Sequence, residues 1–248
     1  MYNTFIFQPL YNGLVGLMDL IPWADVGVAV IIFTVVVKLA LFHLSKASIL
    51  TQVRMKEIEP EANKIKAQYA NDKQAQALKI MELYKQKGIK PFSGILLLII
   101  QLPILLGLLS VFYKIIPTIN SSYLYSPYIY AIPVHTMFLG LINLTKPSLI
   151  LAIITAVAQF IQLQFSLASK QFKPVTAPAS SGTPPLDFAA SMNKQMKYML
   201  PLLAFASVYW IIPARFPQAA SIIALYWIVS TLFTLGQELV IRKRYLKK

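Results

Sequence analysis

Residues 30–45 read VIIFTVVVKLALFHLS, an almost unbroken apolar run that contains one lysine, Lys38. An α-helix rises about 1.5 Å per residue, so about 20 apolar residues cross the hydrocarbon core of a bilayer. The whole chain has the same character, because 57% of its residues are hydrophobic and only 13% are charged. A soluble domain carries about 25% charged residues. The sequence therefore predicts an all-α polytopic membrane protein.

Apolar stretches of membrane-crossing length recur along the chain. We predict five transmembrane helices, at residues 26–45, 92–113, 148–167, 196–212 and 213–241. The fourth is short for a full crossing and needs thinned lipid or shielding by its neighbours. Residues 128–144 are also apolar, but they contain Pro133 and His135, and only three residues separate them from the next span. We therefore assign residues 114–147 to the outer membrane interface.

The formal net charge of +14 is unevenly distributed along the chain. With five spans, the basic residues of 46–91, 168–195 and 242–248 gather on one side. The other side keeps only Lys114, Lys146 and Arg215. Short cytoplasmic segments are enriched in Lys and Arg, so this division predicts an N-terminus outside and a C-terminus in the cytosol. A sixth span would move two basic segments outward.

Residues 1–25 are expected to form an amphipathic helix on the outer membrane surface. Polar positions recur at spacings of four and then three between apolar ones: Thr4, Gln8, Asn12, Gly16 and Asp19 alternate with Phe5, Phe7, Leu10, Leu14, Leu17 and Met18. The alternative is a poorly apolar additional span. The segment has no basic n-region and no obvious cleavage site, so it is not expected to be a signal or transit peptide.

Residues 46–91 form the largest polar block and predict a cytosolic helical hairpin. Two apolar stripes are expected to pair: Ile58, Ile65 and Tyr69 in one helix, and Leu78, Met81, Leu83 and Tyr84 in the other. We place the break at residues 70–72, with Asp72 capping the second helix and Gly88 helping to end it. The alternative is a solvated helical loop without a partner.

The two remaining cytosolic segments have compositions that predict little chemistry. Residues 168–195 are rich in Pro, Ala and Ser and are expected to form a flexible linker. The basic tail at residues 242–248 is expected to anchor the topology, or to touch anionic lipid or ribosomal RNA.

Catalytic and metal-binding signatures are absent from the sequence. It has no cysteine, two histidines, and none of the patterns GxxxxGK[ST], HExxH, GxSG or GxGD. The only acidic residue in a predicted span is Glu238, at the cytosolic end of the last one. Proton-coupled transporters bury carboxylates within the membrane, so this class is disfavoured as well. We expect no enzyme activity, no cofactor and no metal site.

Lys38 has two interpretations. A charge at the bilayer centre costs about 2.5–3.5 kcal/mol on insertion scales. Because Lys38 lies eight residues before Lys46, or about 12 Å along a helix, its amine could snorkel toward the cytosol. Alternatively, it lies in a polar cavity with Thr34, one turn away. Other spans offer polar side chains at similar depth: Gln101, Gln159, Gln162, Thr231 and Thr234.

Several motifs resemble the YidC-type membrane protein insertases and their Oxa and Albino relatives. They are a basic residue followed by LALFHL, the hairpin sequence EIEPEANKIKAQYANDKQAQALKIMELYKQKGIKP, then GILLLIIQLPILLGL, FLGLINLTKPS and FP…LYWIVS. Their order, their spacing and the predicted topology agree with that family from about residue 5 to the end of the chain.

The resemblance implies a five-helix insertase core that encloses a polar groove, open to the cytosol and lipid and sealed outside. The groove receives the hydrophilic tail of a nascent membrane protein, and the apolar segment then slides into lipid. The family's basic residue corresponds to Lys38, and the expected groove lining is Lys38, Thr34, Gln101, Gln159, Gln162, Trp227 and Thr231. The hairpin is expected to contact partners through Arg54, Lys56, Lys64, Lys66, Tyr69 and Lys85.

The resemblance also implies the partners and the location. The partners would be nascent membrane proteins and the lipid bilayer, with the ribosome, the Sec translocon and the signal-recognition-particle receptor as further candidates. One chain is expected to function as a monomer in a prokaryotic plasma membrane.

The sequence departs from the family pattern at four features. The basic residue is Lys38 where the family usually has arginine, and Thr231 stands where asparagine is usual. FPQAASIIALYW has no Gly after FP and a longer gap between FP and LYW than the family pattern, which affects the direction in which Trp227 is expected to point. No large extracytosolic domain is expected from these residues.

Two other function classes fit the composition and topology taken alone. A small-solute or anion channel would use Lys38 for selectivity, and a structural translocon subunit would depend on its packing surfaces rather than on Lys38.

Overall fold

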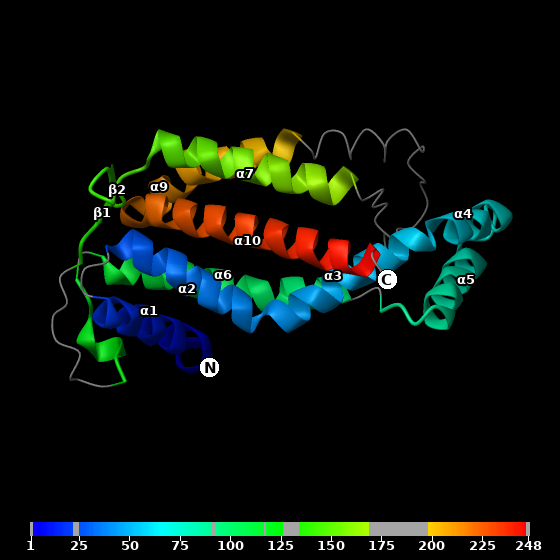
Figure 1. Ribbon diagram of the computed structural model, residues 1–248, viewed down its shortest axis with the longest axis horizontal. Helices are drawn as coiled ribbons and strands as arrows, with labels where there is room; N and C mark the ends of the chain where they lie inside the picture. The colour runs from blue at the N-terminus through cyan, green and yellow to red at the C-terminus, as the bar shows by residue number, and fades with distance from the viewer. Residues whose placement is uncertain are drawn as a thin grey trace.

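The computed structural model describes residues 2–21, 25–90, 93–116, 118–125, 134–168 and 198–246. They form an elongated bundle of long helices, with a smaller helical pair at one end and a short β-hairpin at the other (Figure 1). The predicted all-α membrane fold is confirmed. The predicted linker at residues 168–195 lies, apart from Ala168, outside the described residues.

Helix α10 (Ala220–Leu246) runs through the middle of the bundle (Figure 1). It follows the single turn η4 (Pro217–Ala219) and packs against α7 (Leu149–Ala168) and α2 (Val26–Ala40). The first turns of α10 bury small side chains, including Ala220 and Ala224, and small side chains let neighbouring helices approach closely. A further helical run, 198–215, contains the π-helical turn η3 (Ser207–Ile211) and ends in α9 (Ile212–Arg215).

The first predicted span is bent rather than straight. α2 and α3 (Phe42–Glu57) meet at Leu41 with an angle of 63°. Sharp kinks usually come from Pro, Gly or a π-bulge, and no Pro or Gly lies at this junction. The bend instead coincides with a change of packing partner, because α2 packs on α1 (Gln8–Leu20) and α10 whereas α3 packs on α6 (Ser93–Ile115) and α10. Residues 26–45 therefore contain two helices that meet at a bend, and the membrane span over these residues stays a prediction.

The N-terminal helix has the predicted apolar face. Helix α1 and the preceding turn η1 (Asn3–Phe7) pack against α6, and α1 also packs against α2. Their buried residues are Phe7, Tyr11, Leu14, Val15 and Met18. Phe5, which was expected on this face, is instead 76% exposed. The position of the helix at the outer membrane surface stays a prediction.

The described part of residues 128–144 is extended. Strands β1 (Met137–Phe138) and β2 (Ile142–Asn143) pair antiparallel through a turn in which Leu139 and Gly140 have positive φ. Asp25 joins this hairpin to α2, because its carboxylate accepts hydrogen bonds from the amides of Val28 at 3.0 Å and Leu139 at 2.9 Å. Residues 134–144 therefore form no membrane-crossing helix.

Helices α4 (Glu59–Gln68) and α5 (Lys73–Gln86) form the predicted hairpin. Asp72 caps α5 as predicted, because its side chain accepts from the amides of Gln74 and Ala75. The small core consists of Ile58, Ala62, Ile80, Leu83, Tyr84 and Ile89. The predicted second stripe was wrong in part, because Leu78 and Met81 are exposed and Ile80 takes the buried position.

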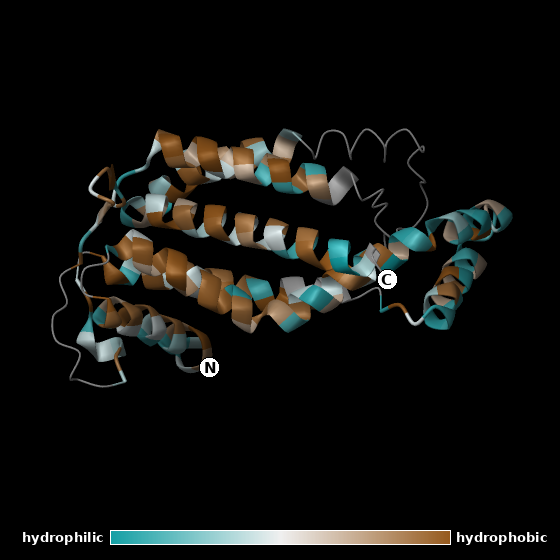
Figure 2. Cartoon of the chain, viewed as in Figure 1, coloured by the Kyte–Doolittle hydropathy of each residue, from teal (hydrophilic) through white to brown (hydrophobic). Residues whose placement is uncertain are grey.

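Length and apolarity mark the membrane-crossing candidates among the described residues. Two helices qualify by themselves, Tyr198–Arg215 and Pro217–Tyr245, and the bent pair α2 and α3 gives a third. Ile99–Ile115 and Leu149–Phe165 are shorter apolar helices. The predicted count of five stays a prediction. Figure 2 shows that the bundle is mostly hydrophobic, whereas α4 is largely hydrophilic and α5 mixes hydrophilic and hydrophobic residues. The division between lipid and cytosol stays a prediction.

Candidate functional site

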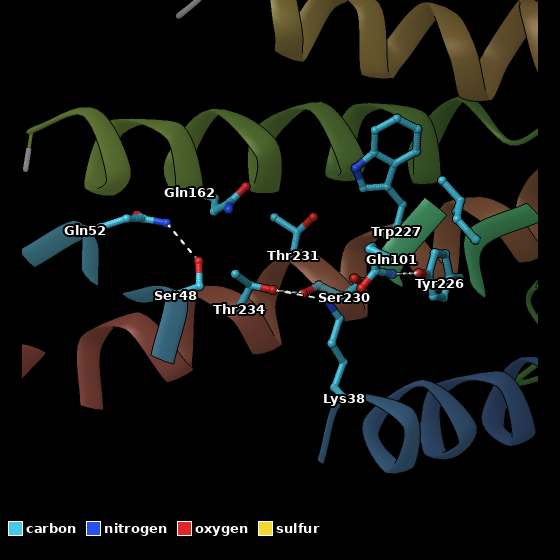
Figure 3. Close-up of a pocket in the computed structure, with 11 residues that line it drawn as sticks. Lys38, Ser48, Gln52, Gln101, Gln162, Tyr226, Trp227, Ser230, Thr231 and Thr234 are labelled. Atoms are coloured by element: carbon cyan, nitrogen blue, oxygen red, sulfur yellow. Dashed lines mark hydrogen bonds between the residues drawn. The ribbon is translucent and has the colours of Figure 1, made fainter. Parts of the chain in front are cut away.

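A cavity of about 380 Å³ lies between α2, α3, α6, α7 and α10 (Figure 3). Most of its lining residues carry a polar group on the side chain, although much of the exposed lining surface is apolar. The lining residues are Lys38, Ser48, Gln52, Gln101, Leu105, Gln162, Tyr226, Trp227, Ser230, Thr231 and Thr234.

Helix α10 supplies most of the polar lining because of its sequence spacing. Tyr226, Ser230 and Thr234 follow one another at intervals of four, so they form one row along the helix. Trp227 and Thr231 form the adjacent row at the same interval. The two rows together give α10 a polar face that the other helices enclose.

The Lys38 amine reaches into this cavity from α2 (Figure 3). Its Nζ donates a hydrogen bond of 3.3 Å to Thr234 Oγ1, and the Thr234 hydroxyl donates in turn to the Ser230 carbonyl at 2.8 Å. Lys38 is partly buried, and none of the ion pairs within the described ranges includes it. The amine therefore has a hydroxyl partner but no paired carboxylate in this part of the chain.

Two side-chain hydrogen bonds tie α10 to its neighbours across the cavity. Gln101 Nε2 on α6 donates to the Tyr226 hydroxyl at 3.0 Å. Trp227 Nε1 donates to Gln159 Oε1 on α7 at 3.1 Å. Gln159 also donates to Gln162 at 3.1 Å. The lining thus carries amide and hydroxyl groups that can exchange partners with a peptide.

The structure brings most of the predicted groove residues together. Those that line the cavity are Lys38, Gln101, Gln162, Trp227 and Thr231. Gln159 is not a lining residue, but it is hydrogen-bonded to two lining residues, Trp227 and Gln162. Thr34 is not among the lining residues, because it is 1% exposed and its hydroxyl donates to the Val30 carbonyl of its own helix at 2.6 Å.

Sequence reasoning missed several members of the lining. Tyr226 and Ser230 could have been found from the four-residue spacing that leads back from Thr234. Ser48 and Gln52 were assigned to the cytosolic hairpin because they follow Lys46 in a polar segment. They reach the cavity because α3 continues the first span through the bend at Leu41.

The predicted partner-contact residues lie on α3, α4, α5 and the turn between α4 and α5. Arg54, Lys56, Lys64 and Lys85 are exposed, whereas Lys66 and Tyr69 are partly buried. Nothing in the described ranges groups three or more His, Cys, Asp or Glu side chains for a metal ion. The cavity is suited to hydrogen bonding and to holding negative charge.

The chain is similar to bacterial proteins named membrane protein insertase YidC. The protein from Stutzerimonas stutzeri is 28% identical over 240 residues, which cover 97% of this chain and 36% of the relative. The protein from Wolinella succinogenes is 25% identical over 242 residues, which cover 98% of this chain and 38% of the relative. The chain thus spans just over a third of the length of such relatives.

A relative of similar length is the YidC protein from Fusobacterium nucleatum, which is 28% identical over 220 residues that cover 88% of this chain and 86% of the relative. The sequence profile of the 60Kd inner membrane protein family matches residues 18–248. The motifs around Lys38, the hairpin and α10 all lie within the matched range, and the predicted resemblance to YidC and Oxa proteins is confirmed. The chain belongs to the 60Kd inner membrane protein family.

Proposed function

We propose that this chain is a membrane protein insertase whose cavity receives the hydrophilic tail of a nascent membrane protein. The observation that carries the proposal is the Lys38 amine, which contacts a hydroxyl in an open cavity between the helices of the bundle. An ammonium group without a paired carboxylate is placed to attract a negatively charged tail.

The cavity lowers the barrier that a polar tail meets in the bilayer. Unpaired peptide and carboxylate groups are strongly disfavoured in hydrocarbon. The hydroxyls of Ser230, Thr231 and Thr234 and the amides of Gln101 and Gln162 offer replacement hydrogen bonds. Release of the substrate's apolar segment into lipid is favourable because of the hydrophobic effect, so the step needs no nucleotide.

The exposed apolar side chains of α7 suit the second half of this process. Ile150, Ile153 and Val157 point away from the bundle core and are between 48% and 61% exposed. We propose that the substrate's apolar helix moves along this face of α7 and along α10. The basic surface of the hairpin is the proposed contact for the ribosome, the Sec translocon or the signal-recognition-particle receptor.

We also propose the topology that the charge distribution favours. The chain would lie as a monomer in a prokaryotic plasma membrane, with five spans, the N-terminus outside and the C-terminus in the cytosol. The family description, an inner membrane protein, agrees with this location.

Reconstitution of four proteins tests the proposal: wild type, Lys38→Arg, Lys38→Ala and Lys38→Glu. A single-span substrate with a short acidic tail is added to proteoliposomes, and protection of the tail from protease measures insertion. We expect the Lys38→Arg variant to insert the substrate and the Lys38→Ala and Lys38→Glu variants to fail. Equal insertion by all four proteins would mean that the Lys38 charge has no role in receiving the tail.

The channel alternative is tested on the same vesicles. An anion channel has a pore that connects both faces, so it would release trapped chloride without any substrate. Proteoliposomes that insert the substrate but retain chloride favour the insertase. A structural subunit would neither insert the substrate by itself nor depend on Lys38.

A further inference from the structure

The polar row on α10 continues beyond the cavity toward the C-terminal end. Ser230 and Thr234 line the cavity, and the next positions at the same interval are Glu238 and Arg242. Residues four apart on a helix are neighbours on one face. Glu238 therefore lies one turn from Thr234, the hydroxyl that accepts the Lys38 hydrogen bond. The row therefore carries a negative and a positive charge, Glu238 and Arg242, beyond the point where the Lys38 amine of α2 contacts it.

Glu238 is buried and already paired. It is 6% exposed, and its Oε1 accepts a hydrogen bond from Arg242 Nη2. A buried ion pair is weak support for stability, because desolvation of the two charges offsets much of their attraction. The pair begins one turn beyond Thr234, which lines the cavity, and this position points to a role other than packing.

Among the residues that the structure describes, two buried hydrogen-bond donors at this end of α10 lack partners, and one of them belongs to the pair. Arg242 Nε and Gln237 Nε2 are buried, and neither has a hydrogen-bond partner within the described part of the chain. Buried donors are normally paired. These two donors add to the polar character of this end of α10.

We propose that Glu238 is a specificity-determining residue that sets which tail charges the groove accepts. This inference rests on the proposed insertase function. The Glu238 carboxylate offsets the positive charges of Lys38 and Arg242. The groove therefore attracts acidic tails less strongly and tolerates basic residues in a tail. The described residues that line the cavity include no Asp or Glu, so Glu238 is the negative group nearest to it on the α10 row.

Removal of Glu238 and removal of Arg242 have opposite expected effects. Glu238→Gln leaves two unopposed cations and favours acidic tails. Arg242→Gln leaves the carboxylate opposed by Lys38 alone, so it shifts the preference toward basic tails. The double variant restores the balance of charge. A structural role would instead reduce insertion of every tail in the same proportion.

The test uses one single-span substrate with three versions of its short tail, which carry three Asp, three Asn or three Lys. Each variant is reconstituted, and the ratio of acidic-tail to basic-tail insertion is measured within that variant. The ratio does not depend on the fraction of protein that folds. A unit charge roughly 8 Å away, at an effective dielectric constant of about 20, changes relative binding by more than about tenfold. We therefore expect the ratio of acidic-tail to basic-tail insertion to be at least about fivefold higher in Glu238→Gln than in wild type.

Glu57→Gln is the matched control. Glu57 is exposed and accepts a hydrogen bond from the Tyr245 hydroxyl at 3.2 Å, so the substitution removes the same charge at the same end of α10, away from the row. We expect its ratio to equal that of wild type, and the ratio of the double variant to return close to it. An unchanged ratio in Glu238→Gln and Arg242→Gln, or an equal rise in Glu57→Gln, overturns the inference. A wild-type protein that inserts no tail above protein-free liposomes overturns the proposed function instead.

Discussion

Lys38 on α2 and Thr234 on α10 are 196 positions apart in the sequence, yet a hydrogen bond of 3.3 Å joins the amine of one to the hydroxyl of the other. The first and last long helices of the bundle therefore share one polar site. The Thr234 hydroxyl holds the amine toward the cavity, because its own proton is donated to the Ser230 carbonyl and its oxygen is free to accept from Lys38.

Thr234→Val is the first prediction that follows from this pair. Valine keeps the shape of threonine and removes the hydroxyl. Hydrogen bonds to charged groups contribute about 1.5–3 kcal/mol, and partial exposure of Lys38 reduces that figure. We expect about tenfold slower insertion of an acidic-tailed substrate, measured by protease protection in proteoliposomes. Thr234→Ser keeps the hydroxyl and should insert at close to the wild-type rate. A valine variant as active as wild type would show that the amine needs no fixed partner.

The bond between Trp227 and Gln159 gives the second prediction. Gln159→Leu removes the acceptor of the indole N–H. We expect the emission of Trp227 to move to shorter wavelength, because the indole loses a polar partner. The measurement uses a background in which Trp23 and Trp210 are replaced by Phe, so that Trp227 is the only tryptophan.

Gln162→Leu is the control for the Trp227 measurement. It removes the acceptor of the Gln159 amide N–H but leaves the bond between Trp227 and Gln159 in place. Its emission should match that of the parent. The same spectrum from Gln159→Leu and the parent would contradict the contact between α7 and α10 at this position.

The site was partly predictable because its residues stand out against an apolar background. A lysine, three glutamines and two threonines inside apolar runs are rare enough to be noticed one by one. The row of Tyr226 and Ser230 follows from the helical repeat alone. Thr34 has the correct spacing from Lys38, yet it is 1% exposed and lies outside the cavity lining. Its hydroxyl donates to the Val30 carbonyl, because a threonine on a helix can bond to its own preceding turn.

Other features depend on tertiary packing and could not be predicted. No Pro or Gly marks the bend at Leu41, so polar residues after Lys46 were assigned to the cytosol although Ser48 and Gln52 reach the cavity. In α5, Leu78, Ile80, Met81 and Leu83 offer two overlapping apolar stripes. Only the packing against α4 decides that Ile80 is buried while Met81 is exposed.

The third prediction concerns Tyr84 in the hairpin core. Burial raises the pKa of its phenol above the ordinary value of 10.0, so the folded state favours the neutral form. The stability that comes from burying the neutral phenol is fully present below about pH 10. It is lost as the pH rises through the pKa of the folded state. We expect the wild-type hairpin to lose helix as the pH rises above about 10.

Tyr84→Phe should move that loss of helix to higher pH, because phenylalanine does not ionise. Circular dichroism of the full chain in detergent, compared between variant and wild type, gives the difference. Tyr125→Phe is the control, since Tyr125 is 63% exposed. This variant should lose helix over the same pH range as wild type. Identical alkaline transitions for Tyr84→Phe and wild type would show that Tyr84 ionises without unfolding the hairpin.

The last prediction tests the contact between the β-hairpin and α2. A Cβ on Gly27 would lie 2.4 Å from Cδ2 of Phe138 and 2.9 Å from the Asp25 carboxylate. Gly27→Ala must therefore displace the ring or the cap, and overpacking of this kind costs about 1–3 kcal/mol. We expect a lower melting temperature in detergent.

Phe138→Leu should recover part of the stability lost in Gly27→Ala, because the smaller side chain makes room for the methyl group. The two substitutions should therefore be coupled in a double-mutant cycle. Gly236→Ala is the matched control on α10, where a Cβ would meet nothing within 4 Å. Alanine is favoured over glycine within a helix by about 1 kcal/mol, so this variant should melt at or above the wild-type temperature. If Gly27→Ala also melts at the wild-type temperature, Phe138 does not pack against the first turn of α2.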